Sequence, residues 1–156
     1  MLNVGDRAPL FVLQDADMET FEQEQEQGKR AVVLFFYPRD NAPTCTSMAA
    51  DFSDHEEAFA RHQCVVIGVS PDDCLTHAEF RDANGLSIRL LSDENKQVCG
   101  QYGVLKAQET EDGSQRSMVI RTVFVIDREG VVRHILQNNA GRIFAAEVLQ
   151  LVKGLE

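Results

Sequence analysis

The sequence predicts a single α/β domain in which helices flank a mixed central sheet. Apolar runs typical of buried strands alternate along the chain with segments of helical periodicity. A hairpin followed by a last helix then closes the chain, and this order of elements predicts a mixed sheet between helices. No internal repeat and no linker rich in proline, glycine or serine divides the 156 residues, so one domain is expected over 1–156.

The first half of the chain contains two predicted buried strands and two predicted helices. Residues 31–37 are apolar at every position, so both faces of a strand formed by them would be apolar, as in a central strand of a sheet. A proline ends this run. Apolar side chains at intervals of three and four predict a helix over 43–61. Residues 65–69 predict the second strand, and a helix is expected over 71–84, after a serine cap. Residues 21–28, rich in glutamine and glutamate, are interpreted as a solvated turn or short helix.

The second half is expected to hold a short strand, a helix, a polar loop, a hairpin of two strands and a final helix. The short strand is predicted over 88–91, the helix over 93–102 and the polar loop over 107–117. The hairpin strands are predicted over 118–126 and 131–136, and the final helix over 142–153.

Charge and composition exclude several classes of function. Twenty-five Asp and Glu against 15 Lys and Arg give a net charge of −10, which opposes nucleic-acid binding. The longest apolar run, residues 31–37, is too short to cross roughly 30 Å of bilayer hydrocarbon, so no membrane span is expected. The N-terminus lacks the basic start and apolar stretch of a secretory signal, which favours a reducing cytoplasm. A mature chain whose signal has been removed would look the same.

Cys45 is the first candidate for a reactive group. The four cysteines suggest reactive or buried thiols rather than a disulfide framework in a reducing compartment. Cys45 is expected in the first turn of a helix that begins near Pro43, where free backbone N–H groups and the helix dipole favour a thiolate. Hydroxyl side chains surround it at Thr44, Thr46 and Ser47. The alternative is a small buried thiol that packs like alanine.

Arg121 interrupts the apolar run 118–126. Burying an unpaired guanidinium is costly, so this side chain must be exposed at an edge or paired. It is either a fixed cation beside an anionic sulfur or a partner of an Asp or Glu. The sequence does not show which way it points.

Residues 35–46, Phe-Phe-Tyr-Pro-Arg-Asp-Asn-Ala-Pro-Thr-Cys-Thr, resemble the active-site segment of peroxiredoxins of the bacterioferritin-comigratory-protein (PrxQ) group. The resemblance continues in order through 68–72, 91–94, 102–104 and 121–127. It implies a thioredoxin-like fold, which is one kind of mixed sheet flanked by helices. It also implies a thiol-dependent peroxidase for hydrogen peroxide or small organic hydroperoxides, without a metal or organic cofactor.

The resemblance assigns roles to three residues. Cys45 corresponds to the peroxidatic cysteine, Pro38 to the proline that shields it, and Arg121 to the arginine that activates thiolate and peroxide. The implied reaction is attack of the Cys45 thiolate on the O–O bond, which forms a sulfenic acid and releases water or an alcohol. A thioredoxin-type or glutathione-type reductant would restore the thiol, and a monomer or weak homodimer is expected.

Three positions depart from the family pattern. Ala42 stands where the family normally has a threonine whose hydroxyl holds the peroxide or the thiolate. Thr44 lies nearby and is considered as a substitute substrate-binding residue. Met48 stands where relatives commonly carry a glutamate, and Ala50 where many carry the resolving cysteine. The usual intramolecular disulfide is therefore excluded.

Cys74 is the first candidate for another resolving cysteine, because some members of the group resolve from the helix after the second strand. A disulfide needs Cα atoms within roughly 7 Å, so the start of a helix would have to unwind. An external thiol acting on Cys45 alone is the alternative. Cys64 and Cys99 are interpreted as core thiols.

Two alternatives to the peroxidase are a metal site and a non-catalytic module. Cys74-x-x-His77 has half of a zinc-site spacing but no second close pair, so no metal site is expected. A peroxiredoxin-like redox-sensing or binding module with little turnover is the serious alternative, and the departures at positions 42, 48 and 50 motivate it. The joint presence of Cys45 and Arg121 argues against it.

Overall fold

The computed structural model describes residues 2–137 and 142–155. Its strands are β1 (Val12–Asp15), β2 (Thr20–Glu22), β3 (Ala31–Phe36), β4 (Cys64–Ser70), β5 (Arg89–Ser92), β6 (Leu105–Glu109), β7 (Gln115–Val119), β8 (Thr122–Ile126) and β9 (Val132–Gln137). Its helices are the 3-10 helix η1 (Gln23–Glu26) and the α-helices α1 (Pro43–Asp54), α2 (Glu56–Arg61), α3 (Cys74–Asn84), α4 (Gln97–Gln101) and α5 (Ala145–Lys153).

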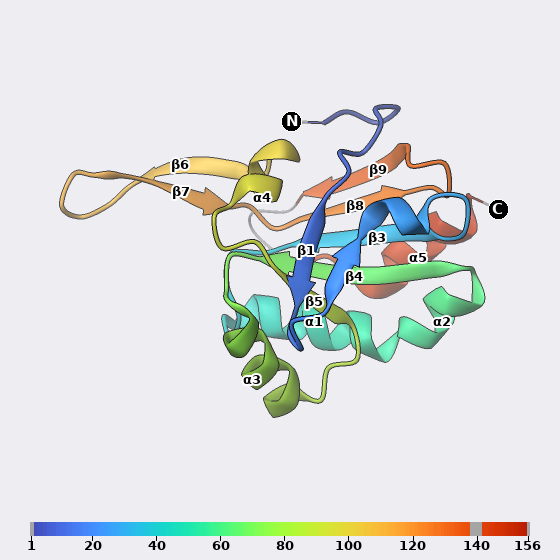
Figure 1. Cartoon of the computed structure of the whole chain (residues 1–156), viewed down its shortest axis with the longest axis horizontal. Coiled ribbons are helices and arrows are strands. Elements are labelled where there is room, and N and C mark those ends of the chain that lie inside the picture. The colour runs from blue at the N-terminus through green and yellow to red at the C-terminus, as the bar shows by residue number, and fades with distance from the viewer. Residues whose placement is uncertain (1, 138–141, 156) are drawn as a thin grey trace.

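A seven-stranded mixed sheet in the order β2-β1-β5-β4-β3-β8-β9 forms the centre of the molecule, and β6 and β7 form a separate hairpin (Figure 1). Strand β3 pairs in parallel with β4 and antiparallel with β8. The predicted mixed sheet flanked by helices is confirmed. Among the helices that the structure describes, none is long and apolar enough to cross a bilayer.

Strand β3 lies at the core, and all of its residues are buried. Its side chains alternate between two apolar clusters. Val33 and Phe35 pack with residues of α1, α2, α3 and α5, whereas Leu34 and Phe36 pack with residues of α4 and the N-terminal segment. Burial on both faces explains why this run of sequence is continuously apolar.

All four predicted α-helices differ from the observed ones. The helix predicted over 71–84 begins at Cys74, because Asp73 rather than the predicted serine is its N-cap. The helix predicted over 43–61 is broken at His55, whose φ of −101° and ψ of 1° separate α1 from α2. The helix predicted over 93–102 shortens to α4, because the Asp93 carboxylate accepts backbone N–H groups of Val98 and Cys99 and so caps a later start. The last helix begins at Ala145 rather than at 142.

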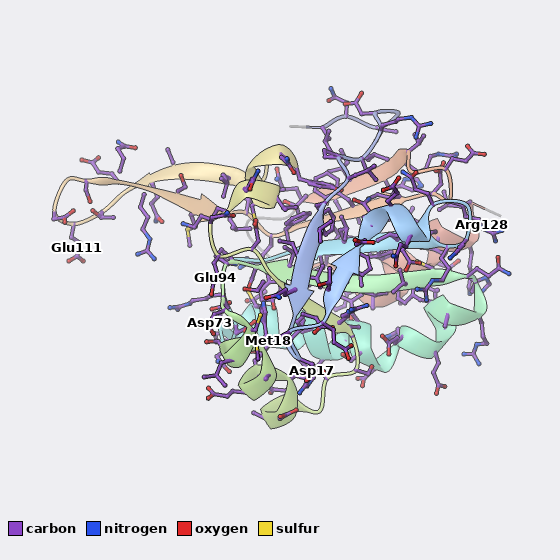
Figure 2. All side chains as sticks on the ribbon, in the orientation of Figure 1. Asp17, Met18, Asp73, Glu94, Glu111 and Arg128 are labelled. Carbon is purple, nitrogen blue, oxygen red and sulfur yellow. The ribbon has the colours of Figure 1, made fainter. Side chains whose placement is uncertain are left out.

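The largest error lies in residues 105–126. The polar segment predicted as a loop over 107–117 forms most of the β6–β7 hairpin, which runs in register from the Leu105–Val119 pair to the Glu109–Gln115 pair. The single strand predicted over 118–126 is divided between this hairpin and β8. Glu111 marks the tip of the hairpin, which projects from the body of the molecule (Figure 2). Both hairpin strands are exposed over most of their length. They therefore lack the alternation of apolar and polar residues by which a half-buried strand is recognised in a sequence.

Candidate active site

Cys45 is the third residue of α1 and is completely buried. The helix begins at Pro43, whose missing N–H costs nothing in the first turn. Ala42 occupies the N-cap position without a side-chain cap hydrogen bond. The predicted place of Cys45 in the first helical turn is therefore confirmed, and the residues before it, 37–42, form the β3–α1 loop.

Opposing effects act on the Cys45 sulfur. Burial raises the pKa of the Cys45 thiol above its ordinary value, and the carboxylate of Asp40 adds to the rise. A hydrogen bond from the backbone N–H of Arg39, together with the charge and hydrogen bond of Arg121, lowers the pKa of Cys45 but does not overcome burial. The thiolate expected from the helix position thus depends on these two donors.

Arg121 lies in the connection between β7 and β8 rather than within a strand. Its guanidinium is close enough to Cys45 to act on the sulfur by charge and by a hydrogen bond. Its Nε is buried and has no hydrogen-bond partner in the described part of the chain. Buried donors of this kind are rare in proteins, and a missing ligand is one explanation for them. The side chain points toward the sulfur, which is the orientation that the sequence left open.

A cavity of about 280 Å³ lies beside Arg121. Pro38 and Arg121 line it from the body of the protein, and the hairpin and its exit contribute the rest, namely Lys106, Ala107, Gln108, Met118, Val119 and Ile120. Neither Cys45 nor Thr44 is among the lining residues. Arg121 is therefore the side chain that joins the cavity to the buried sulfur.

Comparison with known proteins identifies the family. The model of the AhpC/TSA family matches residues 4–135. This chain is a member of that family. It is 33% identical to peroxiredoxin Bcp of Bacillus subtilis over 99% of its own length and 97% of the relative's. It is 37% identical to a putative peroxiredoxin bcp of Coxiella burnetii over 84% of this chain and 85% of that one.

Solved structures agree with this assignment. Peroxidoxin BcpB from Mycobacterium tuberculosis superposes with a TM-score of 0.88 at 28% identity and covers 100% of this chain and 99% of its own. The bacterioferritin comigratory protein of Xanthomonas campestris, described for its alkyl peroxide reduction activity, gives a TM-score of 0.84 at 25% identity, with 93% and 91% covered. The thioredoxin-like peroxiredoxin fold and the Bcp/PrxQ group are thereby confirmed. The protein is a thiol-dependent peroxidase that reduces peroxides through a cysteine thiolate.

The other three cysteines of this peroxiredoxin occupy different surroundings. Cys64 and Cys99 are buried in the two apolar clusters, in agreement with their interpretation as core thiols. Burial raises the pKa of Cys64 to about 12 and raises that of Cys99 further. Cys74 is only half-buried at the first residue of α3, and all four cysteines are free thiols.

Cys74 lines an open groove of about 740 Å³ between the start of α3, β1 and the segment after β5. Asp73 and Glu94 lie at this groove, on the same side of the molecule as Met18 (Figure 2). Burial raises the pKa of the Cys74 thiol, and the nearby Glu94 carboxylate adds to the rise. The thiol is therefore accessible but is not activated in this conformation.

A buried polar network lies beside the β3–α1 loop, and sequence reasoning missed it. The Asp40 carboxylate accepts the Tyr37 hydroxyl at 2.6 Å and lies 2.7 Å from Nδ1 of His77. Asp72 accepts the backbone N–H of Asp40 and the hydroxyl of Ser70, each at 2.7 Å. No local sequence pattern predicts these contacts, because Asp40 and His77 are 37 residues apart in the sequence.

This network also accounts for the one cluster with metal-ligand geometry in the described residues. Ligand-type atoms of Asp40, Asp72 and His77 lie within 4.8 Å of one another. Hydrogen bonds inside the protein already occupy both oxygens of Asp40 and both ring nitrogens of His77. We therefore assign the cluster to a hydrogen-bond network rather than to a metal site.

Proposed function

We propose that this peroxiredoxin reduces peroxides through Cys45 and that Arg121 binds both the thiolate and the peroxide. The observation that carries this assignment is the buried Nε of Arg121, which has no hydrogen-bond partner among residues 2–137 and 142–155. It belongs to a side chain that both lines the cavity and acts on the Cys45 thiol. A buried donor without a partner costs about 1–3 kcal/mol, and a peroxide oxygen that enters from the cavity would satisfy it. Pro38, which lines the same cavity, is proposed to shield the sulfur from bulk water.

The proposed reaction balances without a cofactor. The Cys45 thiolate attacks one peroxide oxygen, the S–O bond forms as the O–O bond breaks, and the electron pair leaves with the second oxygen. That oxygen takes up a proton and departs as water or an alcohol, and Cys45 becomes a two-electron-oxidised sulfenic acid. Arg121 and the Arg39 N–H stabilise negative charge as it moves from sulfur to the leaving oxygen.

Cys74 is proposed as the resolving cysteine. It is the cysteine outside the two core clusters, and it begins α3, where terminal turns open most easily. The first turn is held by the Asp73 carboxylate, which accepts the N–H of Thr76 at 2.8 Å. Attack of the Cys74 sulfur on the Cys45 sulfenic acid forms a disulfide and releases water, after which a dithiol donor reduces the disulfide. Because His77 is buried, unwinding of α3 would stop before this residue if buried contacts are to be kept.

Cys74→Ser is expected to remove the internal disulfide while leaving the first oxidation of Cys45 at the parent rate. Turnover with a thioredoxin-type donor should fall to the rate at which external thiols reach Cys45. The measurement is mass spectrometry of unreduced digests after one equivalent of peroxide, together with steady-state turnover. Cys64→Ser is the matched control and should keep the Cys45–Cys74 link. Full turnover of Cys74→Ser would eliminate this route and leave a one-cysteine mechanism.

Ala42→Thr is expected to increase both helix stability and the rate of Cys45 oxidation. At the N-cap, a threonine oxygen can accept a first-turn N–H, which contributes about 0.5–2 kcal/mol. Its O–H can also donate to the thiolate or peroxide, and a charged hydrogen bond of this kind corresponds to a rate gain of about tenfold. Single-turnover oxidation and thermal unfolding measure the two effects. Ala42→Val has the same shape without the hydroxyl, so equal oxidation rates for the two variants would refute this role.

A redox-sensing module with little turnover is the second candidate. Two observations favour it: Cys45 is completely buried, and burial raises its pKa. Met48 lies in the apolar core and Ala50 packs against it, so α1 carries no extra polar group on that side of the site. Steady peroxide consumption with a thiol donor supports the peroxidase, whereas a single stoichiometric oxidation that never cycles supports the sensor.

The remaining assignments are also proposals. Thr44 is half-buried in the first turn of α1 and stays a candidate for substrate binding. A thioredoxin-type or glutathione-type reductant, a monomeric or weakly dimeric state and a reducing cytoplasm follow from the family chemistry and the four free thiols. The net charge of −10 argues against nucleic acid as a partner.

A further inference from the structure

Both ring nitrogens of His77 face oxygen atoms in the core. Nε2 lies 2.9 Å from the backbone oxygen of Leu91, and Nδ1 lies 2.7 Å from a carboxylate oxygen of Asp40. The Leu91 carbonyl has no proton to give, so Nε2 carries a hydrogen and donates it. The short Nδ1–Asp40 contact then requires one more proton, which the two groups share. The pair is neutral as a whole, whichever of the two atoms holds that proton.

We propose that His77 is a positioning residue for the peroxidatic cysteine and that it acts by holding Asp40, and with it the β3–α1 loop, through this shared proton. The inference rests on the role proposed above for Cys45. It adds a residue of α3, more than thirty positions along the chain, to the machinery of the site.

The geometry of the loop supports this role. Asp40 is held at three points, by the Tyr37 hydroxyl, by His77 and through its own N–H by Asp72. Its neighbour Arg39 provides the backbone N–H that hydrogen-bonds to the Cys45 sulfur. Loss of the His77 contact therefore removes one of the three contacts that hold the segment which aims this donor at the sulfur.

The charge of Asp40 supports the same role. The Asp40 carboxylate raises the pKa of the Cys45 thiol, so a proton shared with His77 protects the sulfur from an uncompensated negative charge. Other titratable groups also face the pair. Burial and the Asp40 charge raise the pKa of Tyr37 well above its ordinary value and keep its phenol neutral. Asp72 lies against the pair from the segment before α3, and the exposed Asp73 is the N-cap of that helix.

Two substitutions separate the contacts of His77 by geometry. In His77→Asn the side-chain amide lies near the place of Nδ1, so it can still donate to Asp40 but cannot share a proton with it. In His77→Gln the amide reaches the place of Nε2, so the contact with Leu91 can remain while the one with Asp40 is lost. Single-turnover oxidation of Cys45 by hydrogen peroxide, followed across pH, reports the midpoint of thiolate formation and the limiting rate at high pH.

We expect the midpoint for Cys45 to move to higher pH in both variants, because neither can compensate the Asp40 charge. The limiting rate should fall about tenfold in His77→Gln and stay within about twofold of the parent in His77→Asn, because only asparagine keeps the loop in place. In an Asp40→Asn background, His77→Gln should change the limiting rate less than twofold, since the group it acts through has been altered.

Three results would overturn the proposal: an unchanged midpoint in both variants, equal limiting rates for His77→Gln and His77→Asn, or an undiminished effect of His77→Gln in the Asp40→Asn background. Thermal unfolding of each variant identifies a general loss of stability, and if His77→Gln does not fold, His77→Asn and Asp40→Asn still test the midpoint. The outcome is separable from that of the proposed function. An active Cys45→Ser variant would refute the function, whereas an inactive one combined with parent-like His77 variants would refute only the positioning role.

Discussion

Cys45→Ser is expected to reduce peroxide consumption to the rate of the thiol donor alone. A serine hydroxyl does not ionise near neutral pH, so it supplies no nucleophile comparable to a thiolate for attack on the O–O bond. The substitution exchanges sulfur for a smaller oxygen at a fully buried position, and the fold should remain. Peroxide consumption with dithiothreitol or a thioredoxin-type donor measures the first effect, and thermal unfolding measures the second.

The matched control for this variant is Cys64→Ser, which makes the same chemical change at a buried thiol of β4. Burial raises the pKa of Cys64 to about 12, so this thiol holds a proton at the pH of the assay and should contribute nothing to peroxide reduction. Cys64→Ser should therefore oxidise at the parent rate. Peroxide consumption by Cys45→Ser at the parent rate would show that another thiol is the nucleophile.

Arg121→Met is expected to slow the single-turnover oxidation of Cys45 by roughly 10- to 100-fold. A hydrogen bond to a charged group contributes about 1.5–3 kcal/mol, and each 1.36 kcal/mol corresponds to a factor of about ten in rate. The Arg121 charge lowers the pKa of Cys45, so its removal should raise that pKa and move the pH profile of oxidation to higher pH. Stopped-flow oxidation followed across pH measures the rate and the shift together.

Arg116→Met is the control for loss of a positive charge near the cavity. Arg116 lies on β7 of the hairpin and is exposed, and it is not among the residues that line the cavity. Its substitution should leave both the rate and the pH profile of Cys45 oxidation unchanged. If Arg121→Met behaved in the same way, its guanidinium would have a structural role only.

Local sequence patterns determined the framework of the site. The uninterrupted apolar run of β3 requires a strand buried on both faces, and the proline at position 43 starts a helix a few residues later. Together they place Cys45 in a first helical turn at the end of a central strand. The end of α3 before Gly85, a C-cap with φ of 59°, agrees with the prediction, whereas its N-cap is Asp73 rather than the predicted serine. These signals lie within a few residues of the structure they specify.

Elements without such a local signal were either not predicted or predicted wrongly. The β6–β7 hairpin is polar and exposed, so its strands show no apolar period, and the break at Ile120 and Arg121 lies inside an apolar run that suggests continuity. Strands β1 and β2 are too short, at four and three residues, for their alternation to stand out. For these segments the pairing partner, rather than the local sequence, decides the conformation.

The sequence by itself therefore determined the fold class, the family and the position of Cys45 at a helix start. Only the tertiary structure decided that Arg121 points to the sulfur, with no partner for its Nε in the described part of the chain, and that His77 reaches Asp40 across 37 positions. It also showed that burial raises the pKa of Cys45 in spite of the helix N-terminus. Helix starts and buried strands are set by neighbours in sequence, whereas a charge or proton in the core is set by whichever distant groups the packed sheet brings within hydrogen-bond distance.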